Sequence, residues 1–438
     1  MIKTISILIG KISLFILEKI GRGSSMPGDF TYKINKNILK NFKLPKTTIV
    51  VTGSSGKGST TKKISQVLKD NNYKVTYNNK GSNERSAIIT ALLKDSDLKG
   101  TIKSDICVFE LDERYVKYVI PDIKPNYIVI TNLTKDQPPR QRHYDFVYEE
   151  IYKGLNNATI ITNADDPYLQ KFNLDNRFKV IYYGINKITN SYKKNKFPVL
   201  NIERCPNCNN KLNYNYYHIE YIGNYTCTNP KCNFKRPLPK YEITNYKDQT
   251  ITINKQYKIY LHNDMLFNYY NTLAAFTTLS EINIDKEKIQ DSFNKINKDK
   301  KIYNKFKNNN HDVYVLNNKN ENAHTFNQSI LYTSQNNNKK TLVIGWWQIS
   351  RRYDFDDLSW LYDIEFELIT NIDKVIVAGP QRYDIATRLK YANIDEKKIK
   401  IYKDLYEAKD EIKQSKTDIY AILNFDYIKP FNEIMEEE

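Results

Sequence analysis

The chain has 438 residues, of which 40% are hydrophobic and 27% are charged. This length excludes one small domain and predicts at least two, and the composition indicates a soluble globular protein. The net charge of +17 could attract nucleic acid, anionic lipid or a phosphorylated substrate, but the Lys residues are scattered and form no basic arm.

The first predicted element is an amphipathic helix within residues 1–21. Its apolar side carries Ile5, Leu8, Ile9, Ile12, Ile16 and Ile20. Charged residues interrupt the apolar stretches and no small-residue cleavage site follows, so we expect neither a signal peptide nor a spanning helix. We expect the apolar side to pack on the protein, with a membrane surface as the alternative. The missing export signal predicts a cytoplasmic protein, and a peripheral position at the inner face of the membrane is left open.

Strands and helices alternate from residue 47 onward. Strands are predicted at 48–52, 106–110, 127–131 and 159–162, and helices at 59–71 and 86–93. Such alternation predicts a mainly parallel sheet with helices on both faces.

A Tyr-, Asn- and Cys-rich segment interrupts this pattern, and a helix at 268–279 resumes it. A second unit has predicted strands at 313–316, 341–344, 374–378 and 419–423. We therefore predict an N-terminal helix and lead-in over 1–46, a central α/β domain over 47–298 with an insertion at about 194–240, and a C-terminal α/β domain over 299–438.

The strongest motif runs from a hydrophobic strand through a Gly/Ser turn into a helix. Its members are Gly53, Ser54, Ser55, Gly56, Lys57, Gly58, Ser59 and Thr60. Glycines let backbone N–H groups turn inward around phosphate oxygens, and the helix N-terminus and Lys57 add positive charge. Only two residues separate Gly53 from the Gly56-Lys57 pair, where the common P-loop has four. The alternative is a turn that merely connects strand and helix.

Four of the five cysteines form two close pairs, Cys205/Cys208 and Cys227/Cys232. Two such knuckles supply four thiolates at tetrahedral range, which predicts a structural zinc ribbon, and two disulfides are the alternative. Cys107 lies in a strand pattern and is predicted to be a core residue.

The phosphate loop resembles the GTNGKT or GTNGKGS loop of Mur ligases and folylpolyglutamate synthases, which form amide bonds through an acyl phosphate. Segments similar to further Mur ligase motifs follow in the expected order, at 81–83, 109–113, 130–137, 162–167 and 268–275. The resemblance implies that ATP and magnesium bind here and that Lys57 and Glu110 act in catalysis. It assigns Thr60, Asn83 and Glu110 to magnesium, and Asn268 and Asn271 to the nucleotide.

Within that superfamily the chain resembles the MurT branch, the Mur-ligase-like subunits of lipid II isoglutaminyl synthases. The resemblance rests on the early ATP loop without a preceding UDP-binding domain, the lead-in at 21–28, the four-cysteine ribbon, and residues 357–367, which are similar to DVSWLWD-x-x-FE. It implies a Mur ligase central domain, a Rossmann-like C-terminal domain, and ATP-dependent amidation of the D-glutamate α-carboxyl of lipid II. Ammonia would come from a GatD-type glutaminase, whose histidine Asp357 would orient. The alternative role of Asp357 is a turn cap.

Several segments depart from the superfamily pattern. Gln137 replaces a histidine, which also resembles the MurT branch, whereas 301–306, 317–323 and 345–352 match poorly. An altered substrate therefore stays open. One rival is a folylpolyglutamate-type ligase that joins an amino acid to another carboxylate, which Gly58-Ser59 favours. The other is a zinc-ribbon nucleic-acid binder, which the few arginines of the ribbon oppose; no nucleic acid partner is expected.

Overall fold

The computed structural model describes residues 2–78, 82–135, 143–198, 202–262, 265–298, 306–319, 321–346 and 357–437. The chain forms two compact units. Unit 1 comprises residues 1–133, 145–194 and 202–298, and unit 2 comprises 134–144, 195–201 and 299–438.

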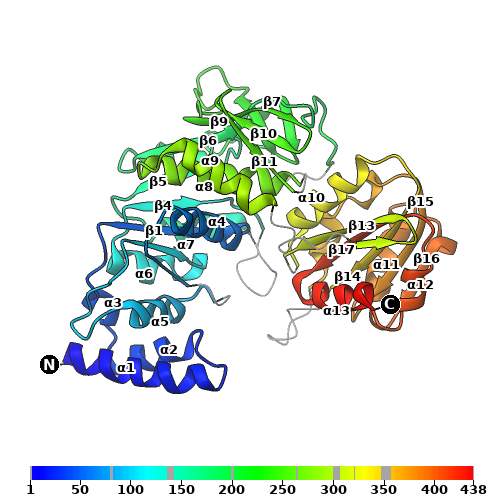
Figure 1. Ribbon diagram of the computed structural model, residues 1–438. Helices are drawn as coiled ribbons and strands as arrows, with labels where there is room; N and C mark the ends of the chain where they lie inside the picture. The colour runs from blue at the N-terminus through cyan, green and yellow to red at the C-terminus, as the bar shows by residue number, and fades with distance from the viewer. Residues whose placement is uncertain are drawn as a thin grey trace. The chain divides into compact units, whose positions relative to one another are not determined.

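Unit 1 is built on a sheet in the order β11-β10-β9-β6-β5-β4-β1-β3-β2 (Figure 1). Its strands are β1 Thr47–Thr52, β2 Val75–Tyr77, β3 Ile106–Glu110, β4 Tyr127–Ile130, β5 Thr159–Asn163, β6 Val180–Ile185, β9 Tyr241–Lys247, β10 Thr250–Ile253 and β11 Tyr257–Tyr260. Pairing is parallel from β2 to β9 and antiparallel from β9 to β11. The central strands are runs of apolar residues buried on both faces, as a parallel sheet requires.

Helices lie on both sides of this sheet. They are α1 Ile2–Lys19, α2 Met26–Ile34, α3 Ile38–Asn41, α4 Lys57–Asp70, α5 Arg85–Asp95, α6 Val116–Ile123, α7 Tyr144–Tyr152, α8 Leu266–Glu281 and α9 Lys286–Lys298. The 3-10 turns η1 Glu113–Tyr115 and η2 Leu169–Leu174 complete the unit. Helices α4, α8 and α9 share one apolar core with the sheet, and α5 and α6 lie on the other side (Figure 1). The predicted parallel sheet with helices on both faces is confirmed.

A separate hairpin in unit 1 is formed by β7 Leu212–Ile219 and β8 Ile222–Cys227, which pair antiparallel. The two cysteine pairs flank this hairpin, and Leu212, Tyr225 and Phe234 pack with them in a small core of their own.

Unit 2 contains a second sheet, in the order β12-β13-β17-β14-β15-β16. Its strands are β12 Phe306–Asn308, β13 His311–Asn318, β14 Lys340–Gly345, β15 Ile372–Ala378, β16 Ile399–Tyr402 and β17 Asp418–Asn424. Its helices are α10 Ala323–Ser334, α11 Arg382–Tyr391, α12 Lys409–Lys413 and α13 Phe425–Glu436, with 3-10 turns η5 Ser359–Asp363, η6 Phe366–Leu368 and η7 Glu396–Lys398. Among the strands described in this unit, only the β12–β13 pair is antiparallel, so the predicted C-terminal α/β fold is confirmed.

The N-terminal helix is present, but the expectation about its packing is wrong. All residues of the predicted apolar side are exposed except Ile9, which is half-buried. The buried residues of α1 are Ser6, Ile7, Gly10 and Leu14. A Cβ at Gly10 would lie 2.6 Å from Thr31 Oγ1 and 2.8 Å from Leu93 Cδ2. The glycine therefore lets this opposite side of α1 approach α2 and α5 closely.

Candidate functional site

The phosphate loop joins β1, which lies between β4 and β3 in the unit 1 sheet, to α4. Gly53 and Gly56 have φ of +123° and +78°, a region that L side chains rarely adopt. Gly56 is the N-cap residue of α4 and, having no side chain, makes no side-chain cap hydrogen bond to the helix. Uncapped N–H groups at a helix N-terminus form an anion site. Within the loop Ser54 is buried, while Ser59 is exposed.

Residues after β4 fix the shape of the loop. Asn132 Oδ1 accepts from Ser55 N–H at 2.9 Å, and Thr131 Oγ1 donates to Ser55 O at 2.6 Å. A Cβ on Gly53 would lie 2.4 Å from Thr131 Oγ1, so glycine is required there. Strand β1 lies between β3 and β4, so the strand order reverses beside it. Open α/β sheets bind ligands at such a reversal.

Lys57 is held by two oxygens. Its Nζ donates to Gly53 O at 2.5 Å and lies 3.2 Å from Glu113 Oε1, and the side chains of both Lys57 and Glu113 are buried. Glu113 was not among the predicted site residues, although three carboxylates in the four residues that begin with Glu110 were a signal for it. In neighbouring Asp112, burial favours the neutral form, but hydrogen bonds from Arg114 and the charge of Lys57 outweigh it and lower the pKa to about 2.

The three magnesium-ligand candidates lie around the start of α4. Asn83 Nδ2 donates to Glu110 Oε1 at 3.1 Å, and a Cβ on Gly58 would lie 3.0 Å from Glu110 Oε2. The Glu110 carboxylate therefore reaches the loop itself. Thr60 lies in the first turn of α4 and is buried. Carboxylate, amide and hydroxyl oxygens beside phosphate donors fit a hard cation that keeps several waters.

Helix α8 brings a distant segment to the same loop. A Cβ on Gly56 would lie 2.4 Å from Asn271 Oδ1, which also accepts from Thr60 Oγ1 at 3.4 Å. Asn268 lies one turn earlier on α8 and is buried. The structure thus brings the predicted loop, magnesium and nucleotide residues into one region of unit 1.

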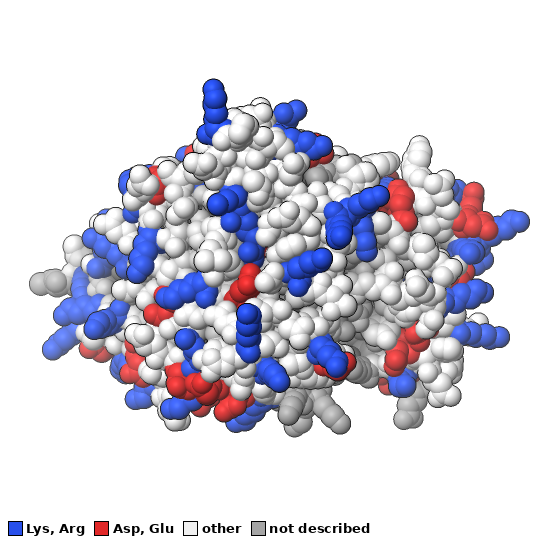
Figure 2. Space-filling model, turned by 90° about the horizontal axis from the view of Figure 1, so that it is seen from above, with Lys and Arg blue, Asp and Glu red and all other residues white. Residues whose placement is uncertain are grey.

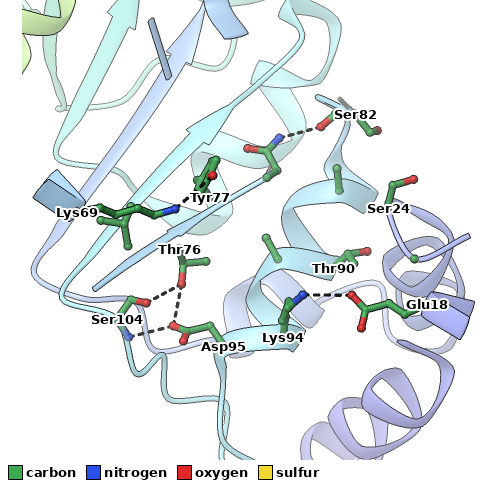
Figure 3. Close-up of a pocket in the computed structure, with 15 residues that line it drawn as sticks. Glu18, Ser24, Lys69, Thr76, Tyr77, Ser82, Thr90, Lys94, Asp95 and Ser104 are labelled. Atoms are coloured by element: carbon green, nitrogen blue, oxygen red, sulfur yellow. Dashed lines mark hydrogen bonds and ion pairs between the residues drawn. The ribbon is translucent and has the colours of Figure 1, made fainter. Parts of the chain in front are cut away.

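A pocket of about 300 Å³ lies along β2 and α5 beside this region (Figure 3). In its wall Thr76 Oγ1 donates to Asp95 Oδ2 at 2.8 Å. At one end Asn78 Nδ2 donates to Ser82 O at 2.9 Å and to Glu110 O at 2.8 Å. One lining residue, Asn78, is therefore bonded to the backbone of the predicted magnesium ligand Glu110.

The segment at 162–167 has a structural contact that the sequence did not indicate. Asp165 is fully buried, and its carboxylate accepts from Arg236 Nε at 2.6 Å, Ile185 N–H at 2.7 Å and Tyr270 Oη at 2.8 Å. Since Arg236 follows the ribbon and Tyr270 belongs to α8, this carboxylate joins the ribbon to the body of unit 1.

The four predicted zinc ligands form one cluster. Their sulfur atoms all lie within 4.8 Å of one another, with Cys205 and Cys232 3.8 Å apart and Cys208 and Cys227 3.4 Å apart. Zn–S bonds of about 2.3 Å in a tetrahedron place sulfurs roughly 3.8 Å apart, whereas a disulfide needs about 2.05 Å. All five cysteines are described and free, so the donor set fits zinc and the alternative of two disulfides is not formed. Hydrogen bonds from Asn210 lower the pKa of the Cys208 thiol to about 6, which favours the metal-binding thiolate. Cys107 is a core residue, as predicted.

Asp357 lies at the start of η5 in unit 2 and is half-buried. Its Oδ1 accepts from Ser359 N–H at 2.9 Å, so it serves as a turn cap. Trp360 is buried against Phe326 and Trp346, which anchors the turn that Asp357 begins.

Some expectations fall outside the described residues. These are the ones that concern Gly81, the segment Asp136-Gln137, residues 301–305, Asn320 and residues 347–352. In the poorly matching segment 317–323, Asn322 is the N-cap of α10 and accepts from Thr325 N–H at 3.1 Å.

The basic charge of the chain forms no single patch on the face shown in Figure 2, where Lys and Arg are spread over the surface and mixed with Asp and Glu. A nucleic-acid site would favour a continuous basic stripe. Across the part of the chain that is described, none of the helices has the length and apolarity needed to cross a membrane.

Two protein-family models match the chain. The Mur ligase middle domain matches residues 51–234, and the MurT ligase C-terminal domain matches residues 319–427. Among curated relatives, the lipid II isoglutaminyl synthase (glutamine-hydrolyzing) subunit MurT of Staphylococcus aureus (strain COL) is 30% identical over 94% of this chain and 92% of its own length. The subunit of the same name from Streptococcus pneumoniae (strain ATCC BAA-255 / R6) is 27% identical over 90% of this chain and 88% of its own.

Solved structures with the same fold include a pseudomurein peptide ligase type C from Methanothermus fervidus. It has a TM-score of 0.68 and 21% identity, and the match covers 92% of this chain and 80% of that one. The MurF ligase from Thermotoga maritima in complex with ADP has a TM-score of 0.59 and 16% identity over 94% of this chain and 84% of that one. At these identities the likeness concerns the fold alone, and it confirms the predicted Mur ligase architecture with its inserted four-cysteine ribbon.

Proposed function

This chain belongs to the MurT family of Mur ligases, and from that premise we propose that it is the ATP-dependent amidating subunit of a lipid II isoglutaminyl synthase. The proposed reaction converts the α-carboxyl of D-glutamate in the lipid II stem peptide to an amide, giving D-isoglutamine. The observation that carries the proposal is the 30% identity, over 94% of the chain, to a relative named as a subunit of that synthase.

The residues around the phosphate loop support the ATP-dependent half of this reaction. The first-turn N–H groups of α4 and Lys57 hold the terminal phosphates, and Glu113 keeps Lys57 directed along the loop. Glu110, Asn83 and Thr60 would hold magnesium, which would neutralise phosphate charge. Asn271 and Asn268 line the nucleotide side of the loop. Lys57 stabilises the charge that develops on the transferred phosphoryl group.

The chemistry needs this activation because a carboxylate is a poor electrophile. A carboxylate oxygen attacks the terminal phosphorus, the bond to the ADP oxygen breaks, and an acyl phosphate forms. Ammonia then attacks the acyl carbon, phosphate leaves with the C–O electron pair, and the nitrogen loses one proton to give the amide.

A partner glutaminase of GatD type supplies the ammonia from glutamine. A Cys–His nucleophile pair requires a third group that orients the imidazole. We assign that role to Asp357, whose position in the MurT-type C-terminal segment supports it. Its anchored turn gives the carboxylate a defined place on the surface of unit 2.

The test is a mass-spectrometric amidation assay with purified protein, lipid II and Mg-ATP, with ammonium or glutamine as nitrogen source and with or without the glutaminase. Conversion of one carboxyl to an amide, with glutamine effective only when the partner is present, supports the proposal. Consumption of a free amino acid without any glutaminase would instead indicate the folylpolyglutamate-type alternative.

Asp357→Asn separates the partner role from the capping role, because asparagine keeps an oxygen for Ser359 N–H. Glutamine-driven amidation should fall about 100-fold while ammonium-driven amidation is unchanged. Asp363→Asn, in the same turn, removes the 2.7 Å ion pair with Lys135 and serves as the matched control. Equal loss of both activities in Asp357→Asn would refute the orienting role.

A further inference from the structure

Helix α1 has two apolar faces, and only one of them packs on the protein. The inner face contains Ile7, Gly10 and Leu14, which are buried against α2 and α5. Lys11 strengthens this attachment, because its Nζ donates to Leu93 O at 2.5 Å. The orientation of α1 on unit 1 is therefore fixed, and so is the direction of its other face.

The outer face of α1 and of the residue that follows it is a continuous apolar stripe. Its exposed fractions range from 45% to 73%, for Ile2, Ile5, Leu8, Ile12, Phe15, Ile16 and Ile20. At 100° per residue these side chains cover roughly 140° of the helix circumference, and Lys19 is the charged residue among them. Single exposed apolar residues are ordinary, but a stripe of this extent marks an interaction surface.

Helix α2 adds apolar residues on its own exposed side. Met26, Phe30 and Ile34 are spaced four residues apart, which places them on one side of the helix, and each is more than 40% exposed. Figure 1 shows α2 beside α1, with α5 above both, so the two exposed sides belong to the same end of unit 1.

The charge around these helices is strongly positive. Residues 1–46 contain nine Lys and Arg and two acidic residues. Both acids are paired with lysines, Glu18 with Lys94 at 3.2 Å and Asp29 with Lys33 at 2.9 Å. The segment that carries the apolar stripe therefore has more cations than acids in its own sequence, and one of these cations, Lys40, is paired with Asp122 at 3.5 Å.

We propose that the outer face of α1 docks on an anionic lipid bilayer and lies in its interface, parallel to the surface. An apolar stripe with basic flanks is the pattern of interfacial helices, in which apolar side chains enter the acyl boundary and lysines contact lipid phosphates. A second copy of the chain is a poorer occupant, because it would bring two basic segments together. The proposal does not depend on the substrate assigned above, and the vesicle-binding test does not use that substrate.

The experiment is flotation of the full-length protein, alone and with its glutaminase, with vesicles of phosphatidylcholine or of phosphatidylcholine mixed with phosphatidylglycerol. The test variant is Ile12→Ser/Phe15→Ser/Ile16→Ser, whose changes are all on the exposed face. The matched control is Leu238→Ser/Tyr383→Ser/Phe425→Ser, which removes three apolar side chains elsewhere that are also more than half exposed. Circular dichroism and thermal melts verify that both variants fold.

The wild type and the control should float with the anionic vesicles, less so at high salt, and the test variant should bind at least about tenfold more weakly. Ammonium-driven amidation of detergent-solubilised lipid II should be the same in all three proteins. Loss of that activity in every protein would refute the proposed function and leave the vesicle result standing.

Three outcomes would overturn the docking proposal. One is that the wild type, with and without the glutaminase, does not bind anionic vesicles. Another is that the test variant floats as well as the wild type. The third is that light scattering shows a wild-type dimer that the test variant converts to a monomer without any vesicle binding.

Discussion

The phosphate loop and the four-cysteine cluster lie in the same unit and are both built from tight turns, but they are held together differently. The loop receives contacts from residues far away in the chain, since Ser55 and Asn132 are 77 positions apart and Thr60 and Asn271 are 211 apart. The cluster is closed within one segment, because Cys205 and Cys232 are 27 positions apart. The sheet therefore shapes the loop before any ligand binds, whereas we expect the ribbon to depend on a bound zinc ion.

The largest effect is expected from Lys57→Met, which removes the cation of the loop and should lower ATP turnover about 1,000-fold. The variant should also lose about 3 kcal/mol of stability, because Glu113 stays buried without Lys57. Lys57→Met/Glu113→Gln should recover most of the melting temperature and none of the turnover. The exposed Lys62→Met, on the same helix, is the control. Turnover that survives in the double variant would show that the loop does not bind the phosphates.

Removal of zinc tests the other side of the comparison. A chelator or Cys208→Ser should lower the amide-exchange protection factors in β7 and β8 by about 100-fold or more, because the ion holds the two knuckles together. Exchange in β1 and α4 should be unchanged, since the sheet supports them. Elemental analysis should find one zinc per chain. Equal deprotection of both regions would mean that the ion also maintains the loop.

Gly56→Ala should disturb the geometry of the phosphate loop. The left-handed backbone of residue 56 costs a side chain about 1–2 kcal/mol, and the added Cβ would lie 2.4 Å from Asn271 Oδ1. ATP binding measured by calorimetry should weaken about tenfold. Gly21→Ala is the matched control, because Gly21 also has a positive φ of +73° but has no atom within 4 Å of the added Cβ. The Gly21→Ala variant should lose about as much stability as Gly56→Ala but keep the ATP affinity of the wild type.

The smallest effect concerns Asp112 and depends on pH. Its pKa is lowered from 3.8 to about 2 despite burial, by Arg114 and Lys57, so its carboxylate stabilises the folded state above pH 4. That contribution is lost as the pH falls from about 4 to about 2. Asp112→Asn should reduce the free energy of unfolding by about 1–2 kcal/mol at pH 7 and by little at pH 2. Exposed Asp70→Asn is the control, and a pH-independent difference would contradict this account.

Much of the fold followed from sequence periodicity. The predicted strands at 106–110 and 159–162 coincide with β3 and β5, because buried parallel strands are short apolar runs. Strands β9 to β11 were not predicted, since their Tyr- and Thr-rich alternation follows the ribbon directly and resembles it in composition.

The sequence by itself determined the features whose groups are close in the chain, namely the glycine-rich loop and the two cysteine pairs. Their spacing is enough because a turn and a metal knuckle are local geometries. Tertiary structure alone decided that Glu113 pairs with Lys57 and that Asp165 binds Arg236. It also decided which side of α1 packs on the protein. Periodicity shows that a helix has an apolar side, but the close approach at Gly10 selected the opposite side for burial.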